Sequence, residues 1–347
     1  MLGLNLLGIK IEEKNEPFEG ACSAQHPLLM ESAVKFQSKA SAELLPADGP
    51  VRTKILGEVT PEKEDKANRV KKHMNWQITE KMTEFFVDSE KMLLAIPIIG
   101  SGFKKTYYDS SLERPVSEYV PMDQFIVPHN ASDLERTPRY THRLYRSEKD
   151  FRSDCASGLY HVDEDFDFTP KAFHITDLGK QTNTLQGMSV SVDDSTGGFT
   201  LYEHYVYKFI PTLEESSENE KFKVPLPYIV TVDVDSRKVI GIRRNWKPSD
   251  RKKKRRNIFT HYQFVPGFGF YGIGFIHLLG NLQLTLTSAL RSLVDAGQFA
   301  NLQGGFKLKG VRIADTNTPI HPGEFKDIES AIQDINKAIM PLPFKGA

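Results

Sequence analysis

The stretch from Ile258 to Lys309 limits most strongly what this chain can fold into. It opens with a strand-like run, crosses a glycine- and aromatic-rich turn, and enters the longest apolar-periodic segment of the chain, residues 276–302. Apolar residues that recur every three or four positions predict an amphipathic helix. Gly304 and Gly305 then separate this segment from a second strand-like run. We therefore expect one long helix that is preceded and followed by β structure.

The composition is that of an ordinary folded protein and gives no charge-based hint of a partner. Of 347 residues, 39% are hydrophobic and 26% are charged, and 45 basic residues balance 45 acidic ones. A signal for nucleic acid or membrane must therefore come from local clusters. The two cysteines, Cys22 and Cys155, provide neither a disulfide scaffold nor a cysteine zinc site. No apolar run approaches the roughly 20 residues that span a bilayer, so we expect a soluble, cytosolic product.

Two helices are expected in the first hundred residues. Apolar residues at helical spacing predict a first helix over residues 26–45. Thr60 as N-cap and Pro61 at the first helical position predict a second helix that runs to about residue 95. We assign the apolar stripe of this second helix to core packing, as is usual for such residues. The stripe consists of Val70, Met74, Ile78, Met82 and Phe85.

The rest of the chain before the long helix reads mainly as β structure. A strand is expected over Val51–Val59, and residues 96–265 are predicted to hold short strands divided by prolines. Turn residues at Asp235–Arg237 predict a hairpin. Residues 161–198 are acidic and rich in Thr, Ser, Gly and Gln, which is typical of a surface loop. Together these patterns predict an α+β protein with short antiparallel strands.

The turn Gly267–Gly272 fits the pattern G-x-G-x-x-G and has two interpretations. It follows a strand-like run and precedes a helix, as a dinucleotide-binding turn does. However, Asp295 falls inside the helical segment rather than after a second strand, and bulky aromatic residues occupy the variable positions. We therefore favour an aromatic elbow that seats the long helix on a sheet. A nucleotide-binding enzyme is kept as an alternative function.

Six adjacent cations form the strongest local charge signal in the sequence. Such a run can bind a phosphate backbone by counterion release, or it can be a solvated loop. No aromatic residue interrupts the run, so stacking on bases is not supported. A basic-loop nucleic-acid-binding protein is therefore a second alternative function. The six residues are Arg251, Lys252, Lys253, Lys254, Arg255 and Arg256.

No catalytic or metal-binding constellation emerges from the sequence. Asp163, Asp165 and Asp167 alternate like the start of a calcium loop, but Phe168 stands where that loop requires Gly and His174 where it requires Glu. The ten histidines are scattered, and the motifs G-x-S-x-G, H-E-x-x-H and G-x-x-x-x-G-K-[ST] are absent from the sequence. We expect a protein that is not an enzyme and that uses no cofactor or metal.

Several segments of the chain resemble the portal proteins of tailed bacteriophages, which are the head-to-tail connectors of the capsid. The run Ile98–Tyr108 is one such segment, and Tyr271–Gly274 with the helix after it is another. The resemblance covers most of the chain from about Pro17 onward. Further matching segments are Arg114–Ser117, Asp133–Leu134, Pro138–His142, Asp295–Gly297, Leu302–Lys307, Pro319–Phe325 and Ile339–Pro343.

This resemblance implies a structural subunit. Portal proteins form a ring, usually a dodecamer, at one capsid vertex, and double-stranded DNA passes through its central channel during packaging and ejection. The implied partners are further copies of the chain, the DNA, the terminase large subunit, and capsid, scaffolding and tail or adaptor proteins. The implied location is the virion, with assembly in the host cytoplasm, and no membrane is involved.

The resemblance also implies three regions. Residues 1–275 correspond to a wing of mixed α and β structure, 276–302 to a stem helix, and 303–347 to a clip-like β segment. Lys307, Lys309 and Arg312 fall in the clip-like segment, where they could meet channel DNA or the terminase. The basic run could instead face the acidic loop of a neighbouring subunit. Family members continue further at both ends, which implies that this chain is a fragment or a split gene product.

Overall fold

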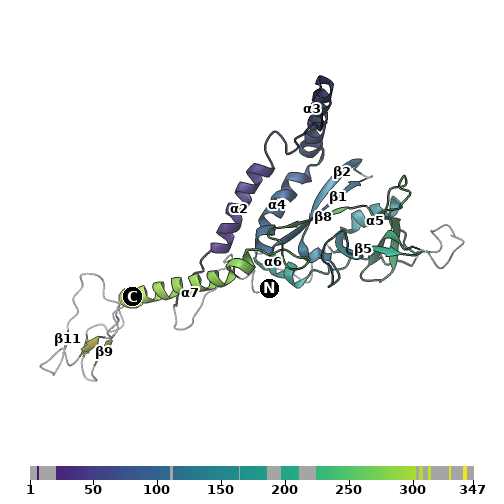
Figure 1. Ribbon diagram of the computed structural model, residues 1–347. Coiled ribbons are helices and arrows are strands. Elements are labelled where there is room, and N and C mark those ends of the chain that lie inside the picture. Colours follow the sequence, from purple (N-terminus) through teal and green to yellow (C-terminus); the bar gives the residue numbers. More distant parts are fainter. Residues whose placement is uncertain are drawn as a thin grey trace. The chain divides into compact units, whose positions relative to one another are not determined.

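The computed structural model divides the chain into two compact units. Met1–Ile9 and Pro27–Asn281 form the first unit, and Lys10–His26 and Leu282–Ala347 form the second. Helices and antiparallel sheets occur together, which confirms the predicted α+β class (Figure 1). The structure describes residues 6–7, 21–109, 112–163, 165–185, 197–210 and 224–301, and four short strands between residues 305 and 341.

Two antiparallel sheets form the centre of the first unit. The larger sheet has the strand order β3-β4-β5-β6-β7, and the smaller has the order β2-β1-β8. The predicted hairpin is confirmed, because β6 and β7 pair on either side of the expected turn. The strands are β1 (Ser101–Asp109), β2 (Arg114–Val120), β3 (Phe125–Ile126), β4 (Arg139–Ser147), β5 (Gly198–Lys208), β6 (Leu226–Asp233), β7 (Val239–Arg244) and β8 (Phe259–Gln263).

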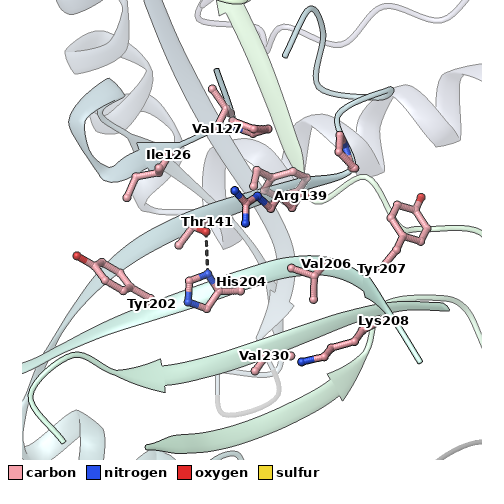
Figure 2. A pocket seen from close by; sticks show the side chains of 13 residues that line it. Ile126, Val127, Arg139, Thr141, Tyr202, His204, Val206, Tyr207, Lys208 and Val230 are labelled. Atoms are coloured by element: carbon pink, nitrogen blue, oxygen red, sulfur yellow. Dashed lines mark hydrogen bonds between the residues drawn. The ribbon is translucent and has the colours of Figure 1, made fainter. Parts of the chain in front are cut away.

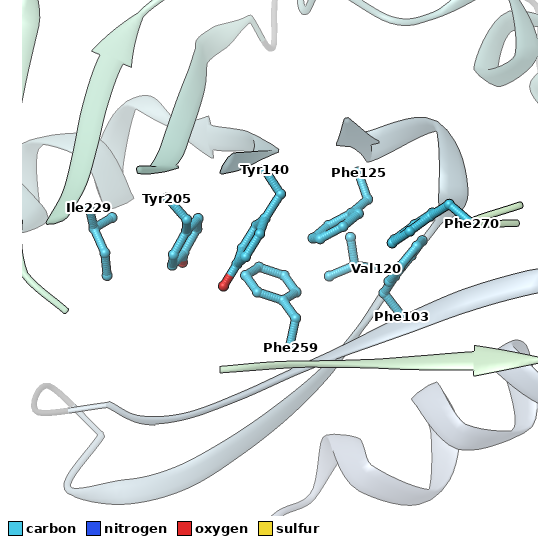
Figure 3. Packing of buried hydrophobic residues seen from close by; sticks show 8 residues of the cluster. All are labelled: Phe103, Val120, Phe125, Tyr140, Tyr205, Ile229, Phe259 and Phe270. Atoms are coloured by element: carbon cyan, nitrogen blue, oxygen red, sulfur yellow. The ribbon is translucent and has the colours of Figure 1, made fainter. Parts of the chain in front are cut away.

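Stacked aromatic rings fill the core between the two sheets (Figure 3). The ring centroids of Phe103 and Phe125 lie 4.1 Å apart, and those of Tyr140 and Tyr205 lie 4.7 Å apart. Phe259 of β8 packs against this row, with its centroid 5.0 Å from that of Phe125. Each such pair contributes about 0.5–1.5 kcal/mol beyond its buried area. Side chains that alternate along the strands thus close one face of each sheet.

Helix α4 (Glu84–Ile99) packs beside α2 (Leu28–Leu44) and covers the free edge of β2 (Figure 1). Glu84 and Asp88 lie one turn apart, on the same face of α4. Their carboxylates accept the backbone N–H groups of Ser117 at 3.1 Å and of Tyr119 at 3.0 Å. An unpaired strand edge would otherwise offer these donors to another chain. The side chains of α4 therefore complete the smaller sheet at its edge.

The second predicted helix is interrupted, so its expected course over residues 61–95 is wrong. α3 covers Pro61–Trp76, a π-helical turn follows over Gln77–Lys81, and two residues separate this turn from α4. Met82 leaves the helical conformation with φ −96° and ψ 74°, and its side chain is buried. The chain changes direction at Met82 and thereby buries this side chain. Apolar spacing alone does not predict such a change.

The interruption also changes two further expectations. In Figure 1, α3 extends away from the two sheets, and Val70 and Met74 are 49% and 43% exposed, so their assignment to the core is wrong. The buried residue of α3 is Asn75, whose Oδ1 accepts the N–H of Val51 at 2.9 Å. The segment Val51–Val59 forms no strand, which corrects the predicted one. The Asn75 side chain thus bonds the Val51 backbone, as a neighbouring strand would in a sheet.

The predicted surface loop over residues 161–198 contains a helix that was not predicted from the sequence. α6 covers Asp177–Leu185, and the Thr176 hydroxyl accepts the N–H of Gly179 at 3.0 Å. A Thr-Asp pair is a typical helix start, but Gly and Thr inside the segment lower helix propensity. A second short helix, α5 (Glu148–Ala156), begins after Ser147, whose Oγ accepts the N–H of Asp150.

α7 covers Phe275–Asn301 and confirms the predicted long helix; from Leu282 onward it belongs to the second unit, where residues 22–24 are bonded to it. The N–H of Cys22 donates to Asp295 Oδ1 at 2.7 Å, and Arg291 Nε donates to the carbonyl oxygen of Ala24 at 2.8 Å. None of the described helices has the length and hydropathy of a membrane span. The strands after α7 are β9 (Gly305–Lys307), β10 (Arg312–Ile313), β11 (Ile328–Glu329) and β12 (Ile339–Pro341), paired as β9–β12 and β10–β11.

A buried ion cluster joins the two sheets of the first unit. Lys105 Nζ of β1 lies 2.7 Å from Glu203 Oε2 of β5, and Arg243 Nη2 of β7 lies 2.8 Å from Glu203 Oε1. The Tyr205 hydroxyl donates to Glu203 Oε2 at 3.0 Å, and His142 Nδ1 lies 3.7 Å from the same oxygen. Burial raises the pKa of Glu203, but the charges of Lys105 and Arg243 outweigh it and hold the pKa well below its usual value.

Replacing Glu203 with Gln leaves Lys105 and Arg243 without their shared counter-ion. Removing one partner of a buried pair costs roughly 3–5 kcal/mol of unfolding free energy. Glu148→Gln is the control, because it breaks an exposed ion pair to Arg152, whose loss is expected to cost less than about 1 kcal/mol. Urea denaturation measures both losses. Similar losses for the two variants would contradict a central role of the cluster.

The buried His142 makes folding stability depend on pH. Burial lowers the pKa of its imidazole to about 4, while an unfolded histidine titrates near about 6.5. Between these values the unfolded chain binds more protons, so stability present above pH ~6.5 is lost as the pH falls toward ~4, by on the order of 3 kcal/mol. Urea denaturation from pH 7 to pH 5 measures this slope. Burial lowers the pKa of His261 to about 4 as well, so we expect His142→Gln to reduce the slope without abolishing it. His129→Gln, at an exposed position, should leave the slope unchanged.

Candidate functional site

The predicted basic run lies in a turn between β7 and β8 that is stabilised by hydrogen bonds within the turn. The Asp250 carboxylate accepts the N–H of Lys252 at 2.9 Å and that of Lys254 at 3.1 Å. The N–H groups of Lys254 and Lys252 lower the pKa of Asp250. Lys253 between them has a φ of 48°, in the left-handed region that non-glycine residues rarely adopt. The turn therefore has one defined backbone conformation.

Arg255 differs from the other five cations of the run. Its guanidinium lies over the rings of Tyr140 and Tyr207, 5.2 Å and 5.6 Å from their centroids. It ties the turn to the segment that precedes β4, and its side chain is engaged in structural contacts. Its three acceptors, at 2.7–2.9 Å, are the carbonyl oxygens of Leu134, Glu135 and Thr137.

The other five cations of the run are exposed. Lys253 Nζ lies 5.8 Å from the centroid of the Trp246 ring, and the Arg244 guanidinium lies 5.8 Å from the same centroid. Within the described part of the chain, no carboxylate forms an ion pair with Arg251, Lys252, Lys254 or Arg256. The described residues therefore leave the charges of these four side chains without a counter-ion.

The predicted cations of the clip-like segment belong to the second unit. Lys307 lies in β9 and Arg312 in β10, whereas Lys309 lies outside the described residues. β9 pairs with β12 and β10 pairs with β11, so the two cations lie in different sheets. Strand pairing therefore does not bring them into one row.

The glycine turn packs tightly against the junction between α4 and β1. Gly100 ends α4 with a φ of 101°, and a Cβ on Gly272 would lie 2.3 Å from the Gly100 carbonyl oxygen. The N–H of Gly272 donates to Ser101 Oγ at 2.8 Å, and that of Ile273 donates to the Val265 carbonyl at 2.8 Å. These donors are thus bonded within the chain. This geometry supports the elbow interpretation over a phosphate cradle.

The aromatic residues of the same turn face in opposite directions. Phe270 is 5% exposed and its ring stacks on His261, with the centroids 4.7 Å apart. Phe268 is fully exposed, at the tip of the turn. Phe270 therefore fills part of the core, whereas no described part of the chain covers Phe268.

A groove of about 740 Å³ lies on the outer face of the larger sheet (Figure 2). The Thr141 Oγ1 and His204 Nδ1 atoms lie 2.8 Å apart within it, and burial lowers the pKa of His204. None of the described residues that line the groove carries a carboxylate, so among them the pair has no acidic partner of the kind found in a catalytic triad. The groove was not predicted from the sequence. Its available signal is the alternation of Tyr202, His204 and Val206 along β5.

The acidic loop contains ordinary surface contacts. Asp163 Oδ2 pairs with Lys238 Nζ at 2.9 Å, and Asp167 Oδ1 accepts the N–H of Thr169 at 2.9 Å. Among the described residues, no group of three or more His, Cys, Asp and Glu side chains is arranged to hold a metal ion. Because Asp163 already has a partner in its own chain, the loop is a weak candidate for contacting the basic run of a neighbour.

Two glycines of the turn test whether it serves packing. Gly272→Ala places a methyl group 2.3 Å from the Gly100 oxygen, and such overpacking is expected to cost about 1–3 kcal/mol of stability. A Cβ on Gly269 meets no atom within 4 Å, so Gly269→Ala should change stability by less than about 0.5 kcal/mol. Thermal denaturation compares them. Equal effects would contradict the packing role of Gly272, and a rise in Tm with NAD or ATP would favour a nucleotide site instead.

A comparison of the chain with protein-family models found no match, and a comparison with curated protein sequences found none either.

Proposed function

We propose that this chain is a portal subunit, which forms a ring at the capsid vertex and provides the passage for viral DNA. The observation that carries the proposal is the uncovered apolar surface of α7, which directly follows the elbow. Leu282 and Leu293 are 50% and 68% exposed, and Ala289 between them is exposed as well. The sequence segments that resemble portal proteins supply the identity of the assembly.

The exposed apolar residues of α7 form a stripe. At about 100° per residue, positions seven and eleven residues after Leu282 return to within about 20° of it, so Leu282, Ala289 and Leu293 share one side of the helix. Helices of soluble proteins usually bury such a stripe, and exposed apolar patches mark interaction sites. This stripe therefore favours a partner helix, which a second copy of the chain provides.

A ring requires more of the helix than a two-fold dimer does. A two-fold contact uses one surface twice, whereas subunits of a ring meet through two different surfaces. Leu284 is 54% exposed and lies about 200° around the helix from Leu282. α7 thus offers apolar side chains on two sides, which suits contacts with one neighbour on each side.

The charge of the chain suits a conduit for DNA. Phosphate contacts add up to tight, salt-dependent binding, and a channel through which DNA slides must avoid such a grip. The 45 basic and 45 acidic residues balance. In the proposed ring, residues 1–275 are the wing, 276–302 the stem and 303–347 the clip. Terminase, capsid, scaffolding and tail or adaptor proteins are its partners, and the virion is its location.

Charged residues in the leucine stripe should prevent assembly. We expect the double variant Leu282→Glu, Leu293→Glu to elute as a monomer under conditions in which the parent forms a large oligomer, because a buried carboxylate without a partner is strongly unfavourable. Size-exclusion chromatography with light scattering measures the mass. Circular dichroism verifies that α7 still forms.

Ser288→Glu is the matched control for this experiment. Ser288 is exposed on the same helix but lies about 120° from Leu282, so it adds a carboxylate without removing a leucine. We expect its oligomer to persist. If the double variant assembles as well as the parent, the leucine stripe is not the subunit contact and the proposal loses its main support.

A further inference from the structure

The turn that holds the basic run concentrates positive charge to a degree that the proposed ring does not explain. The thirteen residues from Arg244 to Arg256 include eight cations and one carboxylate, on a chain with no net charge. Seven of the eight cations are exposed, Arg255 being the exception. The carboxylate, Asp250, is bonded to backbone N–H groups of the turn. A dense positive surface remains.

This surface is fixed before any partner arrives. Asp250 organises the turn from within, and Arg255 fastens it to three carbonyl oxygens outside it. The N–H of Arg256 also donates to the Asn245 carbonyl at 2.9 Å. A surface that is ordered in the free protein loses less conformational entropy on binding. Lys253 has a left-handed backbone conformation. Such strained conformations cluster at functional sites, which supports a functional role for the turn.

The aromatic residue next to the run is already occupied. Cations from Arg244 and Lys253 lie over the Trp246 ring, and Tyr228 packs on it in an edge-to-face arrangement, with the centroids 5.3 Å apart. A base therefore has little free ring surface on which to stack. This arrangement favours contact with a phosphate backbone over contact with unpaired bases.

We propose that the turn Lys247–Arg256 binds the phosphate backbone of duplex nucleic acid through charge alone, without reading bases. Duplex DNA carries about one negative charge per 1.7 Å of axis, a density that matches closely spaced cations. The contacting side chains are Arg251, Lys252, Lys254 and Arg256, for which the described residues provide no counter-ion. The inference does not depend on ring formation, because a single subunit contains the whole surface.

Fluorescence anisotropy with a labelled 20-base-pair duplex tests the proposal on the full chain. Four phosphate contacts contribute a slope of about −3.6 to log K against log salt, or about a hundredfold weaker binding at 200 mM than at 50 mM salt. The variant replaces Arg251, Lys252, Lys254 and Arg256 with Gln. We expect this variant to bind at least about tenfold more weakly at 100 mM salt and to lose most of the slope.

The matched control removes four exposed cations from α3, by Lys66→Gln, Arg69→Gln, Lys71→Gln and Lys72→Gln. It should retain the affinity and slope of the parent. The proposal is overturned if the parent does not bind the duplex at 50 mM salt, or if both variants lose affinity equally. Tighter binding of a single strand than of the duplex would refute the charge-only mode. Binding of poly-glutamate but not of the duplex would assign the surface to an acidic protein.

Discussion

The buried carboxylate of Glu203 is the contact on which the rest of the first unit depends. Through Lys105 and Arg243 it links β1 of the smaller sheet to β5 and β7 of the larger one. β1 begins directly after Gly100, and its first residue, Ser101, accepts the N–H of Gly272. The ion cluster thereby holds not only the aromatic core but also the glycine elbow at which α7 starts.

Local patterns predicted the parts of the fold that local chemistry decides. The long helix and the β6–β7 hairpin follow from apolar spacing and turn residues, and both agree with the structure. The π-helical turn after Trp76 and the missing strand after Val51 depend on where Met82 and Asn75 find burial and hydrogen bonds. Such tertiary contacts leave no periodic trace in the sequence, and the π-helical break could not be predicted from it.

The candidate site divides in the same way. The cationic run can be recognised directly in the sequence. The role of Arg255 cannot, because its side chain donates to carbonyl oxygens about 120 positions earlier in the chain. The groove around His204 likewise exists only once β4 and β5 pair. The molecule thus has two exposed surfaces that would bind partners through different interactions. The leucine stripe of α7 gains free energy by excluding water, whereas the cationic turn acts through charge that salt screens.

Negative-stain electron microscopy of the protein, expressed from its complete reading frame, tests the central proposal most directly. A portal subunit is predicted to yield closed rings with a central hole and a fixed number of copies in top views. Compact single subunits at micromolar concentration, with no rings in any class average, would contradict the proposed function.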